Sequence, residues 1–267
     1  MKILIFVLMN CMPGFSQEKE QRIVSLMPSY TEIIFELGAG SRLAGISNFC
    51  NYPQGTAGIE KIGDYFTPNI EKIYSMRPDI VFAGKWKNSK AVSALKNLGI
   101  NLVEISEERK IEDIFATIRI IGKNTGSEKR AGILVSGMKK ELGKIKKSSK
   151  KTAKSVYAEI DRGYWTCGKN SFISDVIKKA GGKNVFSGVN MPYFQASWED
   201  VIKAKPEIVV LINSEKEEFL KRPLAEKIPA VKSGKIITGI DKDVISRPGP
   251  RIISVIKQLK KEFDGKN

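Results

Sequence analysis

The sequence predicts an α/β protein in which two lobes, each built on a parallel sheet, are joined by a single long helix. Short apolar segments alternate with amphipathic segments through most of the 267 residues, and this alternation is typical of parallel sheets covered by helices. Two stretches in different halves of the chain resemble each other. A long basic segment without proline lies between them. The default ligand site in such a protein is the cleft between the lobes.

The resembling stretches are NIEKIYSMRPDIVFAG (69–84) and SWEDVIKAKPEIVVLI (197–212). Each has glutamate at its third position, Glu71 and Glu199, then a proline seven residues later, an acidic residue and an apolar run. Two copies so far apart do not form a solenoid, in which short repeats stack on one another. The repetition therefore predicts that each half of the chain folds into a similar lobe.

The first half of the chain shows ordinary start and stop signals. Ser29 and Glu32 have the spacing of a capping box at the first helix, and Gly38 and Gly99 follow predicted helices, where glycine favours termination. Pro78 follows another helix and precedes a buried apolar run. The expected strands are 22–26, 43–47, 80–83 and 101–105, and the expected helices are 30–37, 69–76, 89–98 and 111–121.

The second half repeats the alternation after a helix expected over about 127–147, a segment rich in lysine. Gly181 closes the first helix of this half, and Pro250 begins the last one. The expected strands are 155–160, 207–212 and 235–238, and the expected helices are 171–180, 198–204 and 250–263. Together these segments divide the chain into an N-terminal lobe (17–126), a connecting helix (127–150) and a C-terminal lobe (151–267).

Composition excludes most catalytic classes. The chain has 45 basic residues, 29 acidic residues and no histidine. Without imidazole there is no Ser-His-Asp triad, no Cys-His pair and no histidine zinc site. Phosphate-binding loops of the Walker or dinucleotide type are also missing. We therefore expect a binding protein and not an enzyme, although a formal net charge of +16 requires that a polyanionic partner be considered.

The N-terminus is typical of a secretory signal peptide, residues 1–16. Lys2 precedes a short apolar run, and small residues precede the expected cleavage after Ser16. The alternative is lipidation of Cys11, but the residues directly before it, Met9 and Asn10, match a lipidation motif poorly. The location is then periplasmic or otherwise extracytoplasmic. Cys50 and Cys167 remain in the mature chain, and one in each half predicts two separate thiols more readily than a bridge.

Many aromatic residues fall near the expected C-terminal ends of strands, the edge at which open α/β sheets bind ligands. Rings gathered there suit a large, flat, partly apolar ligand, although each ring taken alone could simply pack under a loop. The residues are Tyr30, Phe49, Tyr52, Tyr65, Phe66, Trp86, Tyr164, Trp165, Tyr193 and Phe194.

Three charged residues stand out. Arg247 lies in a stiff proline-rich turn, SRPGPR, which would hold it as a hydrogen-bond donor for ligand oxygens, or simply leave it solvated. Glu71 and Glu199 begin their helices, where a carboxylate is favoured by the helix dipole. That explanation does not account for the repetition, and two equivalent exposed acids could also dock on a two-fold partner with two cationic sockets.

The sequence resembles the extracytoplasmic substrate-binding proteins of ABC importers in the helical-backbone class, and within that class the vitamin B12 (cobalamin) binding proteins. The resemblance covers about residues 22–263. It rests on RIVSLMPSYTEIIFELGAG, GISNFCNYP, NIEKIYSMRPDIVFAG, ASWEDVIKAKPEIVV and SRPGPRII.

This resemblance implies two Rossmann-like lobes that grip a transported corrinoid without any reaction and with no cofactor. It implies that Glu71 and Glu199 dock the protein, expected to be a monomer, on a dimeric membrane permease. Pocket roles are implied for Phe49, Tyr65, Trp86, Trp165, Tyr193, Asp243 and Arg247.

Two other functions stay open at this stage. A ferric siderophore or haem receptor would share the fold and the aromatic cleft, and tyrosinate ligation from Tyr65 or Tyr193 would then be needed for haem. A secreted basic protein that binds nucleic acid is the distant alternative, supported by the lysine-rich stretch 139–154, but no nucleic-acid partner is expected.

Overall fold

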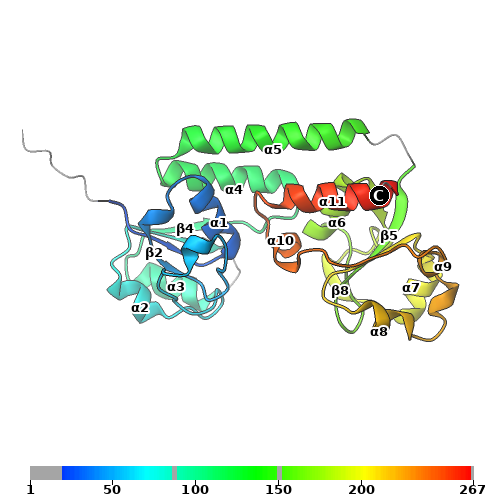
Figure 1. Ribbon diagram of the computed structural model, residues 1–267. Helices are drawn as coiled ribbons and strands as arrows, with labels where there is room; N and C mark the ends of the chain where they lie inside the picture. The colour runs from blue at the N-terminus through cyan, green and yellow to red at the C-terminus, as the bar shows by residue number, and fades with distance from the viewer. Residues whose placement is uncertain (1–19, 86–88, 149–151, 266–267) are drawn as a thin grey trace, which may run out of the picture.

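The structure is a computed structural model that describes residues 20–85, 89–148 and 152–265. Two lobes lie side by side under a shared layer of helices (Figure 1). The expected signal peptide, Cys11 and Trp86 lie outside the described residues. Within the described ranges, no helix is both long and apolar enough to cross a membrane.

The N-terminal lobe contains a four-stranded sheet in the order β2-β1-β3-β4, and all of its pairings are parallel. Its strands and helices confirm the alternation that the sequence predicts. The elements are β1 (Ile23–Ser25), α1 (Pro28–Glu36), η1 (Gly40–Arg42), β2 (Leu43–Ile46), η2 (Gln54–Thr56), α2 (Ile70–Ser75), β3 (Ile80–Gly84), α3 (Lys90–Asn97), β4 (Leu102–Ile105) and α4 (Ile111–Asn124).

The C-terminal lobe follows α5 (Glu128–Ser148). Its sheet has the order β10-β9-β5-β6-β8, with β7 pairing β5. The elements are β5 (Lys154–Asp161), β6 (Trp165–Cys167), α6 (Phe172–Lys179), β7 (Gly182–Asn184), β8 (Tyr193–Gln195), α7 (Trp198–Ala204), β9 (Ile208–Leu211), α8 (Lys216–Leu220), η3 (Ala225–Lys227), α9 (Pro229–Lys232), β10 (Ile236–Ile237), α10 (Lys242–Ser246) and α11 (Ile252–Asp264).

This second sheet is mixed, which corrects the expectation of two purely parallel sheets. The pairs β5–β6 and β6–β8 are antiparallel. Three residues connect β5 to β6, and Gly163 and Tyr164 among them have positive φ angles. So short a connection can only form a hairpin, since a parallel crossover needs a dozen or more residues. Trp165 and Tyr193 therefore lie at the starts of strands and not in loops.

A layer of helices spans both lobes on one side of the molecule. In Figure 1, α4, α5 and α11 run along this side, while α2 and α7 lie at the opposite ends of their lobes. Helix α5 packs against α4 and against α11. The layer ties the lobes together through packed side chains as well as through the chain itself.

The start of α1 differs from the expected capping box. Pro28 occupies the first turn and Met27 is the N-cap, so Ser29 lies inside the helix. Proline is well suited to that position because its φ is already helical and its missing N–H needs no partner. The Ser29 hydroxyl is buried without a hydrogen-bond partner among the described atoms. Glu32 therefore does not form a capping box, and its carboxylate accepts hydrogen bonds from arginines near the end of the chain instead.

The repeated stretches adopt the same local structure in both lobes. Arg77 and Lys205, each directly before a proline, both have φ of 46°. The acidic residue after each proline then accepts a hydrogen bond from the backbone at the start of the neighbouring strand. The Asp79 carboxylate lies 2.7 Å from the Arg22 nitrogen, and that of Glu207 lies 2.8 Å from the Ser155 nitrogen. The sequence repeat is therefore a structural repeat.

Candidate functional site

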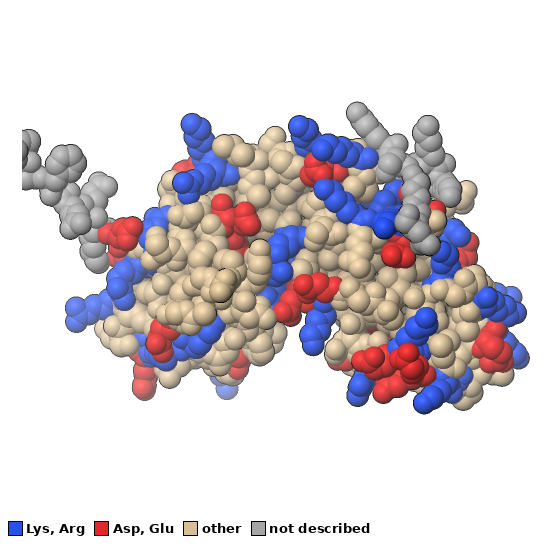
Figure 2. Space-filling view, viewed as in Figure 1, with Lys and Arg blue, Asp and Glu red and all other residues tan. Residues whose placement is uncertain are grey.

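A cleft of about 370 Å³ lies where the lobes meet. The space-filling view shows the molecular surface hollowed between the two lobes, on the side away from the helical layer (Figure 2). Residues from both lobes and from the segment that crosses between them line the cleft. They are Met27, Tyr30, Tyr65, Gly84, Lys85, Ile105, Glu107, Glu108, Phe172, Tyr193, Ser246 and Pro248.

Aromatic rings form the wall on the N-terminal lobe. The Tyr65 ring lies 5.5 Å from that of Phe49 and 4.3 Å from that of Phe66, centroid to centroid. Asp64 orders this loop, because its side chain accepts hydrogen bonds from the backbone nitrogens of Phe66 and Thr67, each at 2.7 Å. Hydrogen bonds from Thr67 lower the pKa of Asp64. Phe49 and Phe66 are exposed, so this wall offers ring faces to a ligand.

The β6–β8 pair supplies the rings of the opposite wall. The register pairs Trp165 with Gln195 and Cys167 with Tyr193, which places Trp165 and Tyr193 on the same face of the ladder. Tyr193 is 37% exposed and Trp165 is 44% exposed. Tyr193 lines the cleft, whereas Trp165 lies outside its lining.

Tyr193 is partly exposed, and its phenol has a raised pKa. Burial is the main cause that raises the pKa of Tyr193 to about 12, and the backbone of Phe172 and Ile173, at the start of α6, opposes that rise. Tyr193 is therefore neutral at neutral pH and can offer a ring face to a ligand.

Carboxyl groups lie at the base of the cleft. Glu108 is buried, and its side chain accepts a hydrogen bond of 2.6 Å from the Thr117 hydroxyl on α4. Burial raises the pKa of Glu108 to about 7, and the negative charges of Asp113 and Glu107 add to the rise. Burial, and then the charge of Glu108, also raise the pKa of Tyr30. Near neutral pH this part of the cleft therefore contains a carboxyl group that is protonated part of the time.

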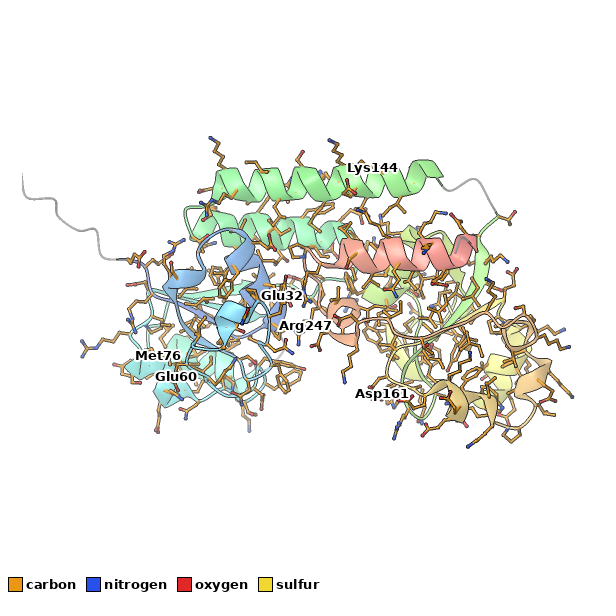
Figure 3. All side chains as sticks on the ribbon, viewed as in Figure 1. Glu32, Glu60, Met76, Lys144, Asp161 and Arg247 are labelled. Carbon is orange, nitrogen blue, oxygen red and sulfur yellow. The ribbon has the colours of Figure 1, made fainter. Side chains whose placement is uncertain are left out.

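A buried ion cluster joins the lobes beside the cleft. The Glu32 side chain, on α1, is 3% exposed. It accepts a hydrogen bond from Nε of Arg251 at 2.8 Å, and Nη1 of Arg247 lies 3.3 Å from its other oxygen. Figure 3 shows Glu32 and Arg247 near each other between the N-terminal lobe and the last helices. One carboxylate thus pairs with two guanidinium groups that come from the far end of the sequence, and Asp243 pairs with one of them, that of Arg247, at 3.2 Å.

The same arginines hold the loop that follows β2. Arg247 donates to the Asn51 side chain at 2.7 Å and to the Phe49 carbonyl at 3.2 Å. Asn51 in turn donates to Asp243 at 2.9 Å, and the Arg251 guanidinium lies 3.9 Å from the ring centroid of Tyr52. We name Glu32, Asn51, Asp243, Arg247 and Arg251 the interlobe latch. The guanidinium N–H groups of the latch donate hydrogen bonds to protein oxygens, so they are not free to bind a ligand in the cleft.

Glu71 and Glu199 are exposed at matching positions of the two lobes. Glu71 lies in the first turn of α2, where the side chain of Asn69 caps the backbone. Glu199 lies in the first turn of α7, where Ser197 is the cap. Neither glutamate has an ion-pair partner within the described part of the chain. Both carboxylates are therefore presented to solvent by capped helix starts at the ends of the lobes remote from the helical layer (Figure 1).

A second buried ion pair supports α7. Glu159, fully buried on β5, lies 2.6 and 2.7 Å from the two terminal nitrogens of Arg222. The Arg222 guanidinium also lies 5.2 Å from the ring centroid of Trp198, the first residue of α7. The indole nitrogen of Trp198 donates to the Pro223 carbonyl at 2.7 Å. The position of Glu199 is consequently fixed by packing directly beneath it.

The structure brings together part of the predicted ligand set. Tyr65 and Tyr193 line the cleft, and Phe49 packs against Tyr65 with the two rings tilted by 58°. Asp243 and Arg247 lie in the latch and not in the cleft lining. Tyr30 lies in α1, within the expected helix, but it is only 1% exposed and does not present a free ring, because the apolar face of α1 packs on the sheet.

Sequence reasoning missed Lys85, Glu107 and Glu108. All three lie within three residues of the C-terminal ends of adjacent parallel strands, β3 and β4. The rule that ligands bind at this edge could have found them. The search for aromatic residues passed over these charged side chains.

Cys50 and Cys167 are both free and buried, which confirms the prediction of separate thiols. Burial raises the pKa of the Cys167 thiol to about 11, and it also raises that of Cys50. Both thiols therefore remain protonated at neutral pH and serve as small core side chains.

Comparison with known proteins agrees with this geometry. The sequence profile of a family described as periplasmic binding protein matches residues 23–242. An uncharacterised ABC transporter substrate-binding lipoprotein of Bacillus subtilis is 32% identical over 253 residues, which cover 91% of this chain and 80% of the relative. A vitamin B12-binding protein of Vibrio vulnificus is 28% identical over 254 residues, or 91% of this chain and 90% of that protein.

Solved structures share the fold. A possible iron-binding, periplasmic solute-binding protein of Staphylococcus epidermidis superposes with a TM-score of 0.81 at 33% identity. The match covers 91% of this chain and 99% of that one. The two-lobed arrangement with an intervening cleft is thus shared over nearly the full length.

We expect Glu32→Gln to lower the free energy of unfolding by about 3 kcal/mol, because the change leaves two poorly solvated guanidinium groups without their shared carboxylate. Denaturant titration measures the loss. Glu36→Gln is the matched control, since Glu36 is exposed on the same helix and the change in charge is identical. Equal stability of the two variants would show that the latch does not hold the lobes together.

Glu108 should make stability depend on pH. Its pKa is about 7 in the folded chain and about 4.5 ordinarily, so between these values the folded state binds the extra proton. Its contribution is therefore most favourable below pH 4.5 and declines by up to about 3 kcal/mol as the pH rises through 7. The free energy of unfolding should be measured across this pH range for the wild type and for Glu108→Gln, and the difference between the two should change with pH. Glu107→Gln, at an exposed neighbour, should show almost none, and a flat difference for Glu108→Gln would contradict the assignment.

Proposed function

This chain belongs to the periplasmic binding protein family, and we propose that it captures cobalamin or a related corrinoid outside the cytoplasm and delivers it to an ABC importer. The observation that carries the proposal is the cleft with ring faces on both lobes, Tyr65 with Phe49 on one side and Tyr193 on the other. A broad, flat ring system can be held between such walls by stacking and burial of apolar area. No bond is made or broken in this process.

The polar groups of the cleft can form hydrogen bonds with the amide side chains at the edge of a corrin ring. Glu107 and Glu108 lie at its base and offer carboxyl oxygens, while Ser246 and the backbone add further groups that accept or donate hydrogen bonds. Amide side chains around a corrin ring carry both donors and acceptors. The rings supply affinity for the face of the macrocycle, and these groups fix its orientation.

A macrocycle of this kind would be gripped rather than enclosed. The cleft volume of about 370 Å³ is at the lower end for small-molecule sites, and the notch between the lobes is open to solvent in Figure 2. We propose that one edge of the ligand enters the cleft while the rest protrudes toward the side that carries Glu71 and Glu199. The ligand would then face the permease that receives it.

A ferric siderophore or haem receptor is the second candidate, favoured by the Staphylococcus epidermidis neighbour that is described as possibly iron-binding. Two features argue against an anionic ligand of this kind. The first is that Arg247 is engaged by the latch and is not free to bind the ligand. Among the described lining residues, Lys85 faces two carboxyl groups, so an anionic ligand would meet more like charge than opposite charge.

Delivery requires contact with the permease. We propose that Glu71 and Glu199 each dock on one half of a dimeric permease, because both are exposed, unpaired within the described residues and equivalent in the two lobes. A two-fold partner offers the same socket twice. Residues 1–16 would direct export, with lipidation of Cys11 as the alternative anchor.

Isothermal calorimetry with cyanocobalamin tests the ligand. We expect Tyr193→Ala to weaken binding by about 1–4 kcal/mol through loss of a stacking ring, and Tyr193→Phe to retain most of the affinity. Tyr74→Ala is the control, because Tyr74 is an exposed ring on α2, outside the cleft. Absence of heat with cyanocobalamin, together with a spectral change on adding haem or a ferric siderophore, would favour the second candidate.

Charge reversal tests docking. Glu71→Arg combined with Glu199→Arg should abolish ligand uptake by cells or by vesicles that contain the permease, while calorimetry shows unchanged ligand affinity. Glu128→Arg combined with Glu262→Arg changes the charge equally on the helical layer and should leave uptake intact. If the docking pair retained uptake, the assignment of these acids would fail without affecting the ligand proposal.

A further inference from the structure

A second hollow, of about 470 Å³, lies outside the ligand cleft, between the start of α4, helix α6 and β7. Among the described residues, five cationic side chains line it, with one carboxylate, Asp175. That carboxylate is engaged, because it accepts a hydrogen bond of 2.9 Å from the backbone nitrogen of Ile111. The cations are Arg109, Lys110, Lys169, Lys178 and Lys183.

Little within the described chain neutralises these cations. Arg109 pairs with Glu107 at 3.0 Å, whereas the four lysines have no ion pair with any described carboxylate. Lys169, Lys178 and Lys183 are exposed at the rim. Polar groups such as Ser171, Ser174 and Asn184 form the rest of the lining. The hollow therefore presents positive charge and hydrogen-bonding groups to one bound partner.

The positive surface continues beyond this hollow. Lys178 also lines a neighbouring groove of about 540 Å³ between α4, α5 and α6, which further contains Lys139, Lys146 and Lys179. In this groove Lys179 pairs with Glu112, and Lys139 lies over the Phe115 ring. The two concavities share Lys178 and so form one connected basic track, too long to be satisfied by a single small anion.

We propose that this basic track binds a linear polyanion of phosphate chemistry, such as an anionic polymer of the cell envelope. Helices α4 and α5, which line part of the track, belong to the layer that lies away from α2 and α7 in Figure 1. A polymer bound there would leave Glu71, Glu199 and the ligand cleft free. The track would retain the protein in the envelope without competing with delivery of its ligand.

The test uses the mature chain and a fluorescently labelled linear polyphosphate, with binding followed by anisotropy at several salt concentrations. The track variant carries Lys169→Glu, Lys178→Glu and Lys183→Glu. The control variant carries Lys221→Glu, Lys227→Glu and Lys232→Glu, at exposed sites elsewhere on the C-terminal lobe. Both triple variants change the net charge equally, so a difference between them reports position and not total charge.

We expect the track variant to bind at least about tenfold more weakly, and its slope of log affinity against log salt to fall by about 2, as three lost contacts imply. The control should stay close to the wild type. Equal losses in both variants would mean that affinity follows net charge alone, which overturns the proposal. Failure of the wild type to bind at low salt would overturn it as well, as would full competition by equimolar inorganic phosphate.

Thermal unfolding and cyanocobalamin calorimetry on both triple variants verify that each is folded. Replacing the same three lysines by glutamine, which removes the charge without reversing it, should weaken polyphosphate binding in the same order but by a smaller factor. The result does not depend on the ligand of the cleft, so failure of the corrinoid proposal and failure of the polyanion proposal can be told apart.

Discussion

The Glu32 carboxylate and the two arginines that it pairs with set the relation between the lobes. A carboxylate at 3% exposure is stable only when its hydrogen bonds are made, and here Arg251 and Arg247 make them from the far end of the chain. The same guanidinium of Arg247 holds the loop of Phe49 and Asn51. One electrostatic requirement therefore positions the lobes and an aromatic wall of the cleft together.

The rings of the cleft are held by the backbone around them and keep accessible faces. Tyr193 lies in the β6–β8 ladder, and the loop of Tyr65 is ordered by Asp64. Rings held in this way lose little further conformational entropy when a ligand arrives.

The two exposed glutamates and the basic track lie on different elements of the molecule. Glu71 and Glu199 repeat because the local structure around them repeats, down to the backbone conformation of Arg77 and Lys205. The cations of the track lie on or beside α4, α5, α6 and β7, which are other elements than those that carry the two acids.

The sequence by itself determined the alternation of strands and helices, the two-lobed plan and the equivalence of Glu71 and Glu199, because periodicity, helix ends and repetition are local properties. It also placed Tyr65 and Tyr193 at a ligand edge. Only the tertiary structure decided that Glu32 leaves its expected cap to meet Arg251, 219 residues away, that β6 pairs antiparallel, and that Arg247 is taken up by the latch. Those outcomes depend on which buried charges and strand edges meet in space, and no local pattern encodes such meetings.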